Sequence, residues 1–328
     1  MNNINLFSSF LNIRDSIYAN DLIIYGLTKS GIIDLMKKDP PGITFQEIVR
    51  KLKLKPRPLK VLIDLLVAMK FFELKKDKYF LDEDFEKGVV NSGLIYYLTE
   101  LNQREFVLGF EKVFKTDEPI PYPKRNQKWE KSLDNTKFVK EFNNTMKVRG
   151  ALLAKELFKN INLNKNKTLL LLDIGGSSGI YSKEATLKFN KLNAIVLDKN
   201  TVLKKTIKGK RLRFECLDMF TEGYPNADLH LYSNVLHDWN EKENLFLLKK
   251  SYKSLPKKGK IIVHDAFYGA KAKEDISILS YSALLMLLTH GRCYSIGEMK
   301  ELLEKAGFKG IIYKKTIAGR GVIIGEKH

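Results

Sequence analysis

Short, nearly continuous apolar runs mark the second half of the chain, and stretches with helical spacing separate most of them. The runs are LLLLDI (169–174), NAIVLD (193–198), LRFECLD (212–218), ADLHLYSNVL (227–236) and KIIVHDAF (260–267). Runs that are apolar on both faces are typical of parallel strands covered by helices on both sides. The pattern predicts an α/β domain with a mostly parallel sheet. The closing segment, 310–328, predicts an antiparallel hairpin that adds an antiparallel edge strand.

The first 92 residues show helical spacing instead. Apolar residues recur at this spacing over 15–36, and DPPG (39–42) ends the pattern. Thr44 and Glu47 form a capping-box signature for a short helix over 45–52, and a second helix begins at Pro56 or Pro58. The segment 71–81 alternates around a charged centre and predicts a hairpin. Two helices followed by a two-stranded wing indicate a winged helix-turn-helix.

Residues 92–160 are predicted to be largely helical. A polar, proline-containing interruption, TDEPIPYPK (116–124), suggests a connector and lid, and 138–158 forms one long amphipathic helix. The longest apolar run, SYSALLMLL (280–288), is too short to span a bilayer, which needs roughly 18–20 apolar residues. We interpret it as a buried helix, and we expect no membrane span.

The charge of the chain raises the question of an anionic partner. The chain has 328 residues and a formal net charge of +19. Such an excess of positive charge is found in proteins that bind nucleic acids or anionic membranes. Here the basic residues are dispersed among acidic ones, and the second helix, PLKVLIDLLVAMKFF (58–72), offers few side chains that could read bases. We therefore expect a packing or dimerising role for this domain and no nucleic-acid partner.

Cysteine usage and the start of the chain bear on its compartment. The two cysteines, Cys216 and Cys293, lie far apart, so neither a disulfide framework nor a cysteine-built zinc site is predicted. The first residues carry no secretory signal pattern. We expect a cytoplasmic protein without a bound metal.

A turn rich in small residues follows the first apolar run. Asp173 ends that run, and GGSSG (175–179) follows it and opens a helix. Small residues let the backbone approach a ligand closely, and ligands of open α/β sheets bind at this edge. No Gly-Lys-Ser/Thr follows, so the turn is not a phosphate loop. A dinucleotide-binding fold remains an alternative for this turn taken alone.

Acidic residues end the next two runs. Asp198 lies beyond the glycine turn, where a carboxylate can accept hydrogen bonds from both hydroxyls of a ribose. A capping aspartate is the alternative interpretation. Asp218 is followed by Met219 and Phe220, a combination that can bind an adenine amino group and cover the ring. By itself, the segment from Asp218 to Phe220 leaves the ligand open.

The fourth run ends in YSNVLHDW (232–239), which contributes His237. A neutral imidazole can accept a proton near neutral pH, whereas a phenol is mostly protonated there and benefits from a base. A catalytic histidine needs a partner that orients it, and a carboxylate serves this role well. Asp265, at the end of the next run, is the natural candidate.

With these motifs, the chain resembles the class I S-adenosylmethionine-dependent O-methyltransferases of the plant caffeic-acid type, which have bacterial polyketide-tailoring and vertebrate hydroxyindole relatives. The resemblance covers nearly the whole chain. Its motifs are FNNTMKVRG (142–150), DIGGSSG (173–179), SNVLHDWNEKENLFLLKKSYKSLPKKGKIIV (233–263) and MKELLEKAGF (299–308). The histidine–aspartate–tryptophan segment within the third of these is the most specific.

The resemblance implies a division of the chain and an assembly. It implies a winged-helix dimerisation domain over 1–92, a helical connector and lid region over 93–160, and a Rossmann-like catalytic domain over 161–328. The implied assembly is a homodimer, and the implied setting is secondary metabolism. The donor would be S-adenosylmethionine, with S-adenosylhomocysteine as product and no metal.

The resemblance also assigns roles to individual residues. His237 would be the catalytic base, Asp265 would orient it, and Asp238 would shape the wall beside it. Residues expected around the donor are Asp173, Gly175, Gly176, Ser177, Gly179, Asp198, Asp218, Met219, Phe220 and Ser233. Residues expected around a small hydroxylated acceptor, aromatic or polyketide-like, are Met146, Trp239, Met286, His290 and Cys293.

Three positions depart from the family pattern. Cys293 stands where relatives commonly have a glutamate beside the catalytic histidine, Ser177 stands where glycine is usual, and Leu217 stands where a glycine commonly precedes the adenine-binding acid. The alternative function is therefore a member that binds S-adenosylmethionine without transferring its methyl group. Such a member would catalyse another tailoring reaction, or act as a cofactor-sensing or DNA-associated regulator.

Overall fold

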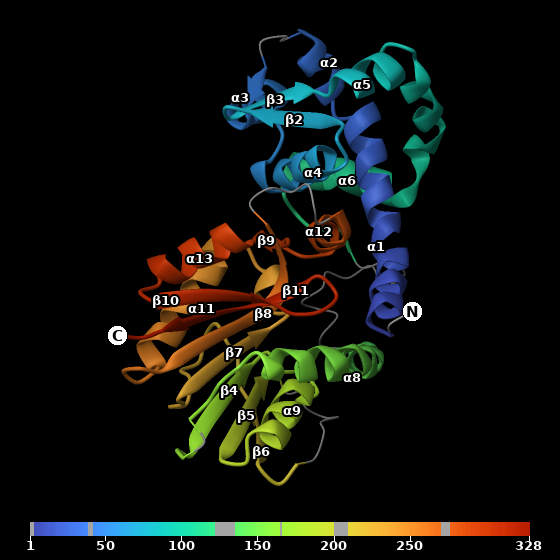
Figure 1. The fold of residues 1–328 in the computed structure, drawn as a ribbon. Helices are drawn as coiled ribbons and strands as arrows, with labels where there is room; N and C mark the ends of the chain where they lie inside the picture. Colours follow the sequence, from blue (N-terminus) through green and yellow to red (C-terminus); the bar gives the residue numbers. More distant parts are fainter. Residues whose placement is uncertain (1–2, 39–41, 122–134, 165, 200–208, 270–275) are drawn as a thin grey trace. The chain divides into compact units, whose positions relative to one another are not determined.

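The computed structural model describes residues 3–38, 42–121, 135–164, 166–199, 209–269 and 276–328 (Figure 1). The chain forms two compact units. The first contains Met1–Pro121 and Tyr268–Cys293, and the second contains Tyr122–Phe267 and Tyr294–His328. One internal segment of the sequence therefore belongs to the same unit as the amino-terminal residues.

The first unit is mainly helical. Its α-helices are α1 (Asn3–Thr28), α2 (Ile32–Lys38), α3 (Phe45–Leu52), α4 (Pro56–Ala68), α5 (Glu83–Phe85), α6 (Glu105–Thr116) and α12 (Ile276–Leu288). A π-helix, η1 (Glu86–Val90), and a 3₁₀-helix, η2 (Leu94–Gln103), join α5 to α6. A small sheet has the strand order β1-β3-β2, from β1 (Ile43–Thr44), β2 (Phe72–Lys75) and β3 (Lys78–Leu81).

Local sequence signals account for much of this unit. Helix α3 begins with the expected capping box: the Thr44 side chain accepts a hydrogen bond from the Glu47 amide, and Glu47 Oε2 accepts one from the Thr44 amide at 2.9 Å. The hairpin expected over 71–81 is formed by β2 and β3 and gains β1 as a third strand. The helix expected over 15–36 is instead two helices. They are separated at Gly31, whose φ of +78° is incompatible with a continuous helix.

The second unit contains a mixed sheet with helices on both faces (Figure 1), which confirms the predicted fold class. The strands are β4 (Leu169–Ile174), β5 (Leu192–Asp198), β6 (Leu212–Cys216), β7 (Leu229–Ser233), β8 (Lys260–Tyr268), β9 (Tyr294–Ser295), β10 (Lys309–Lys315) and β11 (Arg320–Glu326). Their order is β10-β11-β8-β7-β4-β5-β6, with β9 paired to β8. The helices are α8 (Thr136–Lys159), α9 (Ile180–Lys188), α11 (Glu241–Ser254) and α13 (Ile296–Lys305), with a 3₁₀ turn, η3 (Leu236–Asp238).

The antiparallel strand lies one position inside the edge, which corrects the prediction of an antiparallel edge strand. Strand β11 pairs antiparallel with both β8 and β10, so β10 occupies the edge and runs in the same direction as β8. The burial of the two strands explains this order. Val322 and Ile323 of β11 are fully buried, whereas β10 is largely exposed or half-buried. The more apolar strand of the hairpin therefore takes the inner position.

The strand register brings the carboxyl ends of four parallel strands to one edge of the sheet. Ile174 of β4 lies opposite Leu197 of β5 and Tyr232 of β7, and Ser233 lies opposite His264 of β8. The loops after these strands therefore meet at this edge, as the general rule for ligand sites in open α/β sheets requires. Among the described helices, none is both long and apolar enough to cross a membrane.

Candidate active site

A pocket of the second unit opens at the carboxyl edge of the sheet. It is lined by the glycine turn after β4, the ends of β5 and β7, the loop after β6 and the helix α8. The lining includes every residue predicted around the donor except Gly179, and it also includes Asp238 and Trp239. The structure therefore brings together residues from five separate segments of the sequence.

The glycine turn can exist only with small residues at two of its positions. A Cβ atom on Gly176 would lie 2.7 Å from Asp173 Cγ and 2.7 Å from Val196 Cγ1. Gly179 has a φ of +78° and precedes α9, and a Cβ there would lie 2.8 Å from Phe214 Cζ. Gly179 therefore shapes the turn without lining the pocket. The close approach at Gly176 keeps the pocket floor free of side chains.

Two carboxylates stand on either side of this turn, Asp173 buried and Asp198 half-buried. Asp173 Oδ2 accepts a hydrogen bond from Ser182 Oγ at 2.7 Å, and Asp173 Oδ1 is buried without a hydrogen-bond partner among the described residues. Burial raises the pKa of Asp173 to about 7. An acid in this state favours a ligand that brings a donor or a positive charge to its second oxygen.

Asp198 ends β5 and closes the turn from the other side. Its Oδ2 accepts a hydrogen bond from the Ser177 amide at 2.9 Å, and its Oδ1 accepts one from the Lys199 amide at 2.8 Å. Burial raises the pKa of Asp198 to about 6, against the effect of these two amides. Each carboxylate oxygen can accept a further hydrogen bond, so the geometry suits a vicinal diol.

The loop after β6 forms an apolar wall of the pocket. Asp218 Oδ1 accepts a hydrogen bond from the Phe220 amide at 2.8 Å, which folds the loop back on itself. Lys250 Nζ donates to the carbonyl of Met219 at 2.7 Å. The Phe220 ring packs edge-on against Trp239 with the ring centroids 4.6 Å apart. Met219, Phe220 and Trp239 thus present a surface that suits a flat aromatic base.

A buried histidine–aspartate pair lies beside the pocket. His237 Nδ1 is 2.5 Å from Asp265 Oδ1, and both side chains are buried. Asp265 Oδ1 also accepts a hydrogen bond from the Ala266 amide at 2.8 Å. Burial raises the pKa of Asp265, but His237, Arg320 and this amide outweigh it, so the net pKa lies below the usual value.

The ionised state of Asp265 sets the tautomer of the histidine. A carboxylate can only accept a hydrogen bond, so Nδ1 of the neutral imidazole carries the proton and Nε2 carries the lone pair. Nε2 lies 3.7 Å from Asp238 Oδ1. His237 itself does not line the pocket, whereas its neighbour Asp238 does. Nε2 is therefore the ring nitrogen that faces Asp238, a residue of the pocket lining.

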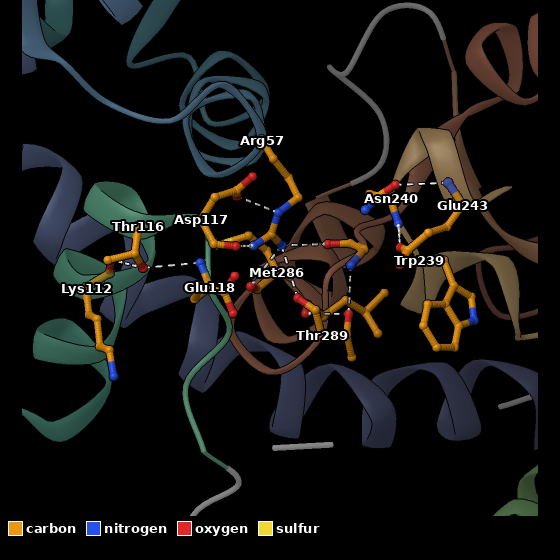
Figure 2. Close-up of polar contacts among 12 residues, drawn as sticks. Arg57, Lys112, Thr116, Asp117, Glu118, Trp239, Asn240, Glu243, Met286 and Thr289 are labelled. Carbon is orange, nitrogen blue, oxygen red and sulfur yellow. Dashed lines mark hydrogen bonds and ion pairs between the residues drawn. The ribbon is translucent and has the colours of Figure 1, made fainter. Parts of the chain in front are cut away.

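The turn that carries His237 is held by the start of the next helix. Asn240 caps α11: its amide donates to Glu243 Oε2 at 3.0 Å, and its Oδ1 accepts from the Glu243 amide at 3.0 Å (Figure 2). The buried Asn244 side chain donates to the carbonyl of Trp239 at 3.1 Å. A capping box directly after the histidine–aspartate–tryptophan segment thus restricts the motion of this turn.

Several pocket residues were not predicted from the sequence. Arg149 and Tyr181 line the pocket, as do Lys199 and Asn234. Tyr181 Oη accepts a hydrogen bond from Asn234 Nδ2 at 3.2 Å, and burial raises the pKa of Tyr181. Asn234 could have been found, because it lies in the same strand-end motif as His237. Arg149 lies within the motif FNNTMKVRG (142–150), but that motif does not by itself show that the arginine reaches a pocket formed far away in sequence.

The residues predicted around the acceptor fall in different parts of the molecule. Met286, His290 and Cys293 belong to the first unit and do not line the pocket of the second unit. Cys293 is buried, and its amide donates to Ser282 Oγ at 3.1 Å. The side chain of Met146 lies outside the described residues. Within the described ranges, no three histidine, cysteine, aspartate or glutamate side chains are grouped to hold a metal ion.

Comparison with known proteins shows the family to which the chain belongs. A family model described as the O-methyltransferase domain matches residues 105–309. The chain is 26% identical over 298 residues to O-methyltransferase 7 of Dictyostelium discoideum, covering 86% of this chain and 84% of that protein. It is also 26% identical over 306 residues to trans-resveratrol di-O-methyltransferase of Vitis vinifera, covering 85% and 84% of the two chains.

Solved structures share the fold. An O-methyltransferase family 2 protein from Planctomyces limnophilus, crystallised with apigenin, superposes with a TM-score of 0.85 at 23% identity, over 98% of this chain and 96% of that one. Human N-acetylserotonin methyltransferase, crystallised with S-adenosylmethionine, superposes with a TM-score of 0.61 at 18% identity, over 97% of each chain.

Proposed function

Because the chain belongs to the S-adenosylmethionine-dependent O-methyltransferase family, we propose that it methylates a hydroxyl group of a small aromatic acceptor with His237 as general base. The observation that carries the proposal is the buried pair formed by His237 and Asp265, beside a pocket lined by the glycine turn, Asp198 and the loop after β6. When bound, S-adenosylmethionine supplies an electrophilic methyl group on a sulfonium.

The pocket residues fit each part of this donor. The unpartnered Oδ1 of Asp173 suits the ammonium group of its methionine portion, and Arg149 suits the carboxylate. Asp198 would accept hydrogen bonds from the two ribose hydroxyls. The loop that carries Asp218, Met219 and Phe220 would bind the adenine. The glycine turn leaves room for the backbone to approach the methionine portion.

The base chemistry follows from the hydrogen bond between His237 and Asp265. Asp265 accepts from Nδ1–H, so Nε2 is the ring nitrogen that would take the proton of an acceptor hydroxyl. The imidazolium that forms is stabilised by the neighbouring carboxylate, whose pKa is already low. Holding the acceptor oxygen aligned with the methyl group would supply much of the remaining rate enhancement.

The acceptor class is proposed from the relatives and from the residue types available. Two of the relatives are named for trans-resveratrol and for acetylserotonin, and a structural neighbour was crystallised with apigenin. All three molecules are small hydroxylated aromatics. We propose that Met146, Trp239, Met286, His290 and Cys293 contribute to the acceptor site of this protein.

A homodimer that pairs through the winged-helix domain, residues 1–92, is part of the proposal. Helix α1 exposes three large apolar residues at helical spacing: Phe10 is 73% exposed, Ile13 68% and Ile17 47%. These side chains lie on one face of the helix, because they are three and four residues apart. An apolar stripe of this kind suits a second copy of the same chain.

The winged helix gives no support to a regulator that binds DNA. Helix α4, the second helix of the motif, buries most of its residues within the first unit, including Leu59, Val61 and Ile63. A helix that reads a major groove must expose its side chains. The other alternative, a family member that binds S-adenosylmethionine but catalyses another reaction, is distinguished by an assay of methyl transfer.

The test is transfer of label from methyl-labelled S-adenosylmethionine to apigenin, trans-resveratrol and N-acetylserotonin. We expect a methylated product from at least one acceptor, and calorimetric binding of S-adenosylhomocysteine. Donor binding without transfer to any hydroxyl would favour the non-methylating alternative. Absence of donor binding would contradict the proposed pocket altogether.

A further inference from the structure

The segment Tyr268–Cys293 joins two strands of the second unit but belongs to the first. It contains α12, which packs against α1 and α4. The same segment carries Met286, His290 and Cys293, which we place in the acceptor site. The hydrogen bonds that fix the backbone of this segment therefore determine the positions of those three side chains.

One guanidinium group holds the carboxyl end of α12. Arg57 Nη1 donates to three backbone carbonyls, those of Met286 at 3.1 Å, Thr289 at 3.1 Å and Gly291 at 3.0 Å (Figure 2). The last carbonyls of a helix have no partner within the helix, and a cation near them is favoured by the helix dipole. Arg57 thus supplies the hydrogen-bond donors that a further turn of α12 would have provided to these carbonyls.

The other edge of the same guanidinium is fixed to α6. Arg57 Nε donates to Asp117 Oδ1 at 2.7 Å, and Arg57 Nη2 donates to the Asp117 carbonyl at 2.9 Å (Figure 2). The Arg57 side chain is only 11% exposed. With both edges bonded, the planar group cannot rotate without breaking several hydrogen bonds.

The same helix also holds the other end of the segment. Tyr268 Oη donates to Asp64 Oδ2 at 2.9 Å, and Lys60 Nζ lies 2.5 Å from the same oxygen. Arg57, Lys60 and Asp64 are three and four residues apart, so they share one face of α4. This face therefore holds both ends of the segment that contains α12.

We propose that Arg57 is a positioning residue for acceptor binding, because the two carbonyls on either side of His290 are hydrogen-bonded to its guanidinium. The inference rests on the proposed function. Fixing the peptide groups of Thr289 and Gly291 fixes the backbone of His290 between them. Arg57 touches neither donor nor acceptor in this proposal and acts through that turn.

The test compares Arg57→Gln and Arg57→Lys with the wild-type protein. The panel of acceptors is apigenin, trans-resveratrol and N-acetylserotonin, and the one that the wild-type protein methylates with the highest kcat/KM is used. Glutamine removes the charge and most donors, whereas lysine keeps the charge but lacks the planar fork. We expect the KM for the acceptor to rise about tenfold or more in R57Q and by less in R57K. The affinity for S-adenosylhomocysteine should stay within about twofold of wild type.

Arg211 provides a matched control in the second unit. Its guanidinium closes the end of α9 in the same way, donating to the carbonyls of Phe189 at 2.7 Å, Asn190 at 2.7 Å and Leu192 at 3.0 Å. Leu192 begins β5, whereas the pocket lies where β5 ends. Arg211→Gln should lower the thermal midpoint but leave the KM for the acceptor unchanged.

The outcomes separate the two proposals. A raised acceptor KM in R57Q, partly restored in R57K and absent in R211Q, supports the positioning role. An acceptor KM equal to wild type in the Arg57 variants, or one raised equally in R211Q, overturns it while the methyltransferase activity stands. If R57Q does not fold, R57K alone decides. A wild-type protein that binds donor but methylates no panel acceptor contradicts the proposed function itself, and the positioning role with it.

Discussion

The orientation of the His237 imidazole depends on one carboxylate. Asp265 accepts a hydrogen bond from Nδ1 and is itself held by the Ala266 amide, so the ring has a defined tautomer before any ligand arrives. The sequence already paired these residues, because His237 follows one apolar run and Asp265 lies near the end of the next. Their separation of 2.5 Å depends on β7 and β8 being adjacent.

Replacing His237 with alanine should lower kcat by roughly 10²–10⁴, because the group that accepts the hydroxyl proton is removed. Binding of S-adenosylhomocysteine should change little, since His237 does not line the pocket. Steady-state kinetics and calorimetry measure the two effects. Asp265→Asn is the companion variant: it keeps the imidazole but favours the wrong tautomer, so it should also lower kcat. Unchanged turnover in H237A would exclude the imidazole as base.

Ser177 adopts a conformation that favours glycine. Its φ is +51°, and its amide still donates to Asp198 at 2.9 Å. A residue with a Cβ costs roughly 1–2 kcal/mol in the left-handed region. Ser177→Gly should therefore raise the free energy of unfolding by about 0.5–1 kcal/mol, since the extra freedom of glycine in the unfolded chain offsets part of the gain.

Urea unfolding of S177G, with Ser177→Ala as control, tests this prediction. Alanine removes the hydroxyl but keeps the Cβ, so S177A should not be stabilised. Equal stability of S177G and S177A would show that a Cβ atom at this position carries no net strain.

At the scale of helices and strands, the correct predictions came from signals that lie within a few residues of one another in the sequence. The capping box predicted before α3 joins the Thr44 side chain to an amide three residues away, and the structure has boxes of the same kind before α11 and α13, which were not predicted. Such a signature is complete within four residues and needs no knowledge of the fold. The break between α1 and α2 was not predicted, because the spacing of apolar residues carries no information on the φ angle of Gly31.

The stripe of Phe10, Ile13 and Ile17 predicts a homodimer that an added charge disrupts. Ile13→Glu, on an exposed face of α1, should shift the mass measured by light scattering from dimer to monomer, because a carboxylate in an apolar interface loses its hydration. Leu187→Glu is the matched control, since Leu187 is an exposed aliphatic residue on α9, 63% exposed, that does not belong to the stripe. A wild-type monomer at micromolar concentration would contradict the dimer. A dimer that persists in I13E would place the interface elsewhere.

At the scale of the whole molecule, buried titratable groups link stability to pH. Burial lowers the pKa of His230 and of His264 to about 3 each, well below the value of an unfolded histidine. Below about pH 6.5 the unfolded chain binds protons that the folded chain excludes, so these histidines lower stability as pH falls. The raised pKa values of Asp173 and Asp198 act in the opposite direction, because the folded state favours their protonated forms.

A single variant isolates the histidine effect. His230→Phe removes one titrating group next to Tyr224, whose ring lies 5.7 Å away. Relative to wild type, the free energy of unfolding of H230F should increase by about 1.4 kcal/mol for each unit that the pH falls below 6.5. Chemical denaturation between pH 4.5 and 7.5 measures this difference, and the values above pH 7 report packing alone. A difference that does not vary with pH would show that His230 is protonated in the folded state.

The sequence by itself determined the alternation of strands and helices, the glycine turn and the set of acids and the histidine at strand ends. Each is a local property: an apolar run, a backbone conformation that only small residues tolerate, or a residue placed directly after a strand. The order of parallel strands then follows a few general rules, so the predicted donor residues, apart from Gly179, line one pocket.

Tertiary structure alone decided which distant residues meet. Arg149 reaches the pocket from α8, β11 takes the inner position beside β8, and Arg57 binds carbonyls more than 200 residues further along the chain. Nothing in the immediate neighbourhood of these residues in the sequence shows what they contact. Their positions depend on which surfaces bury the most apolar area and which backbone groups are left without a partner once the chain has folded.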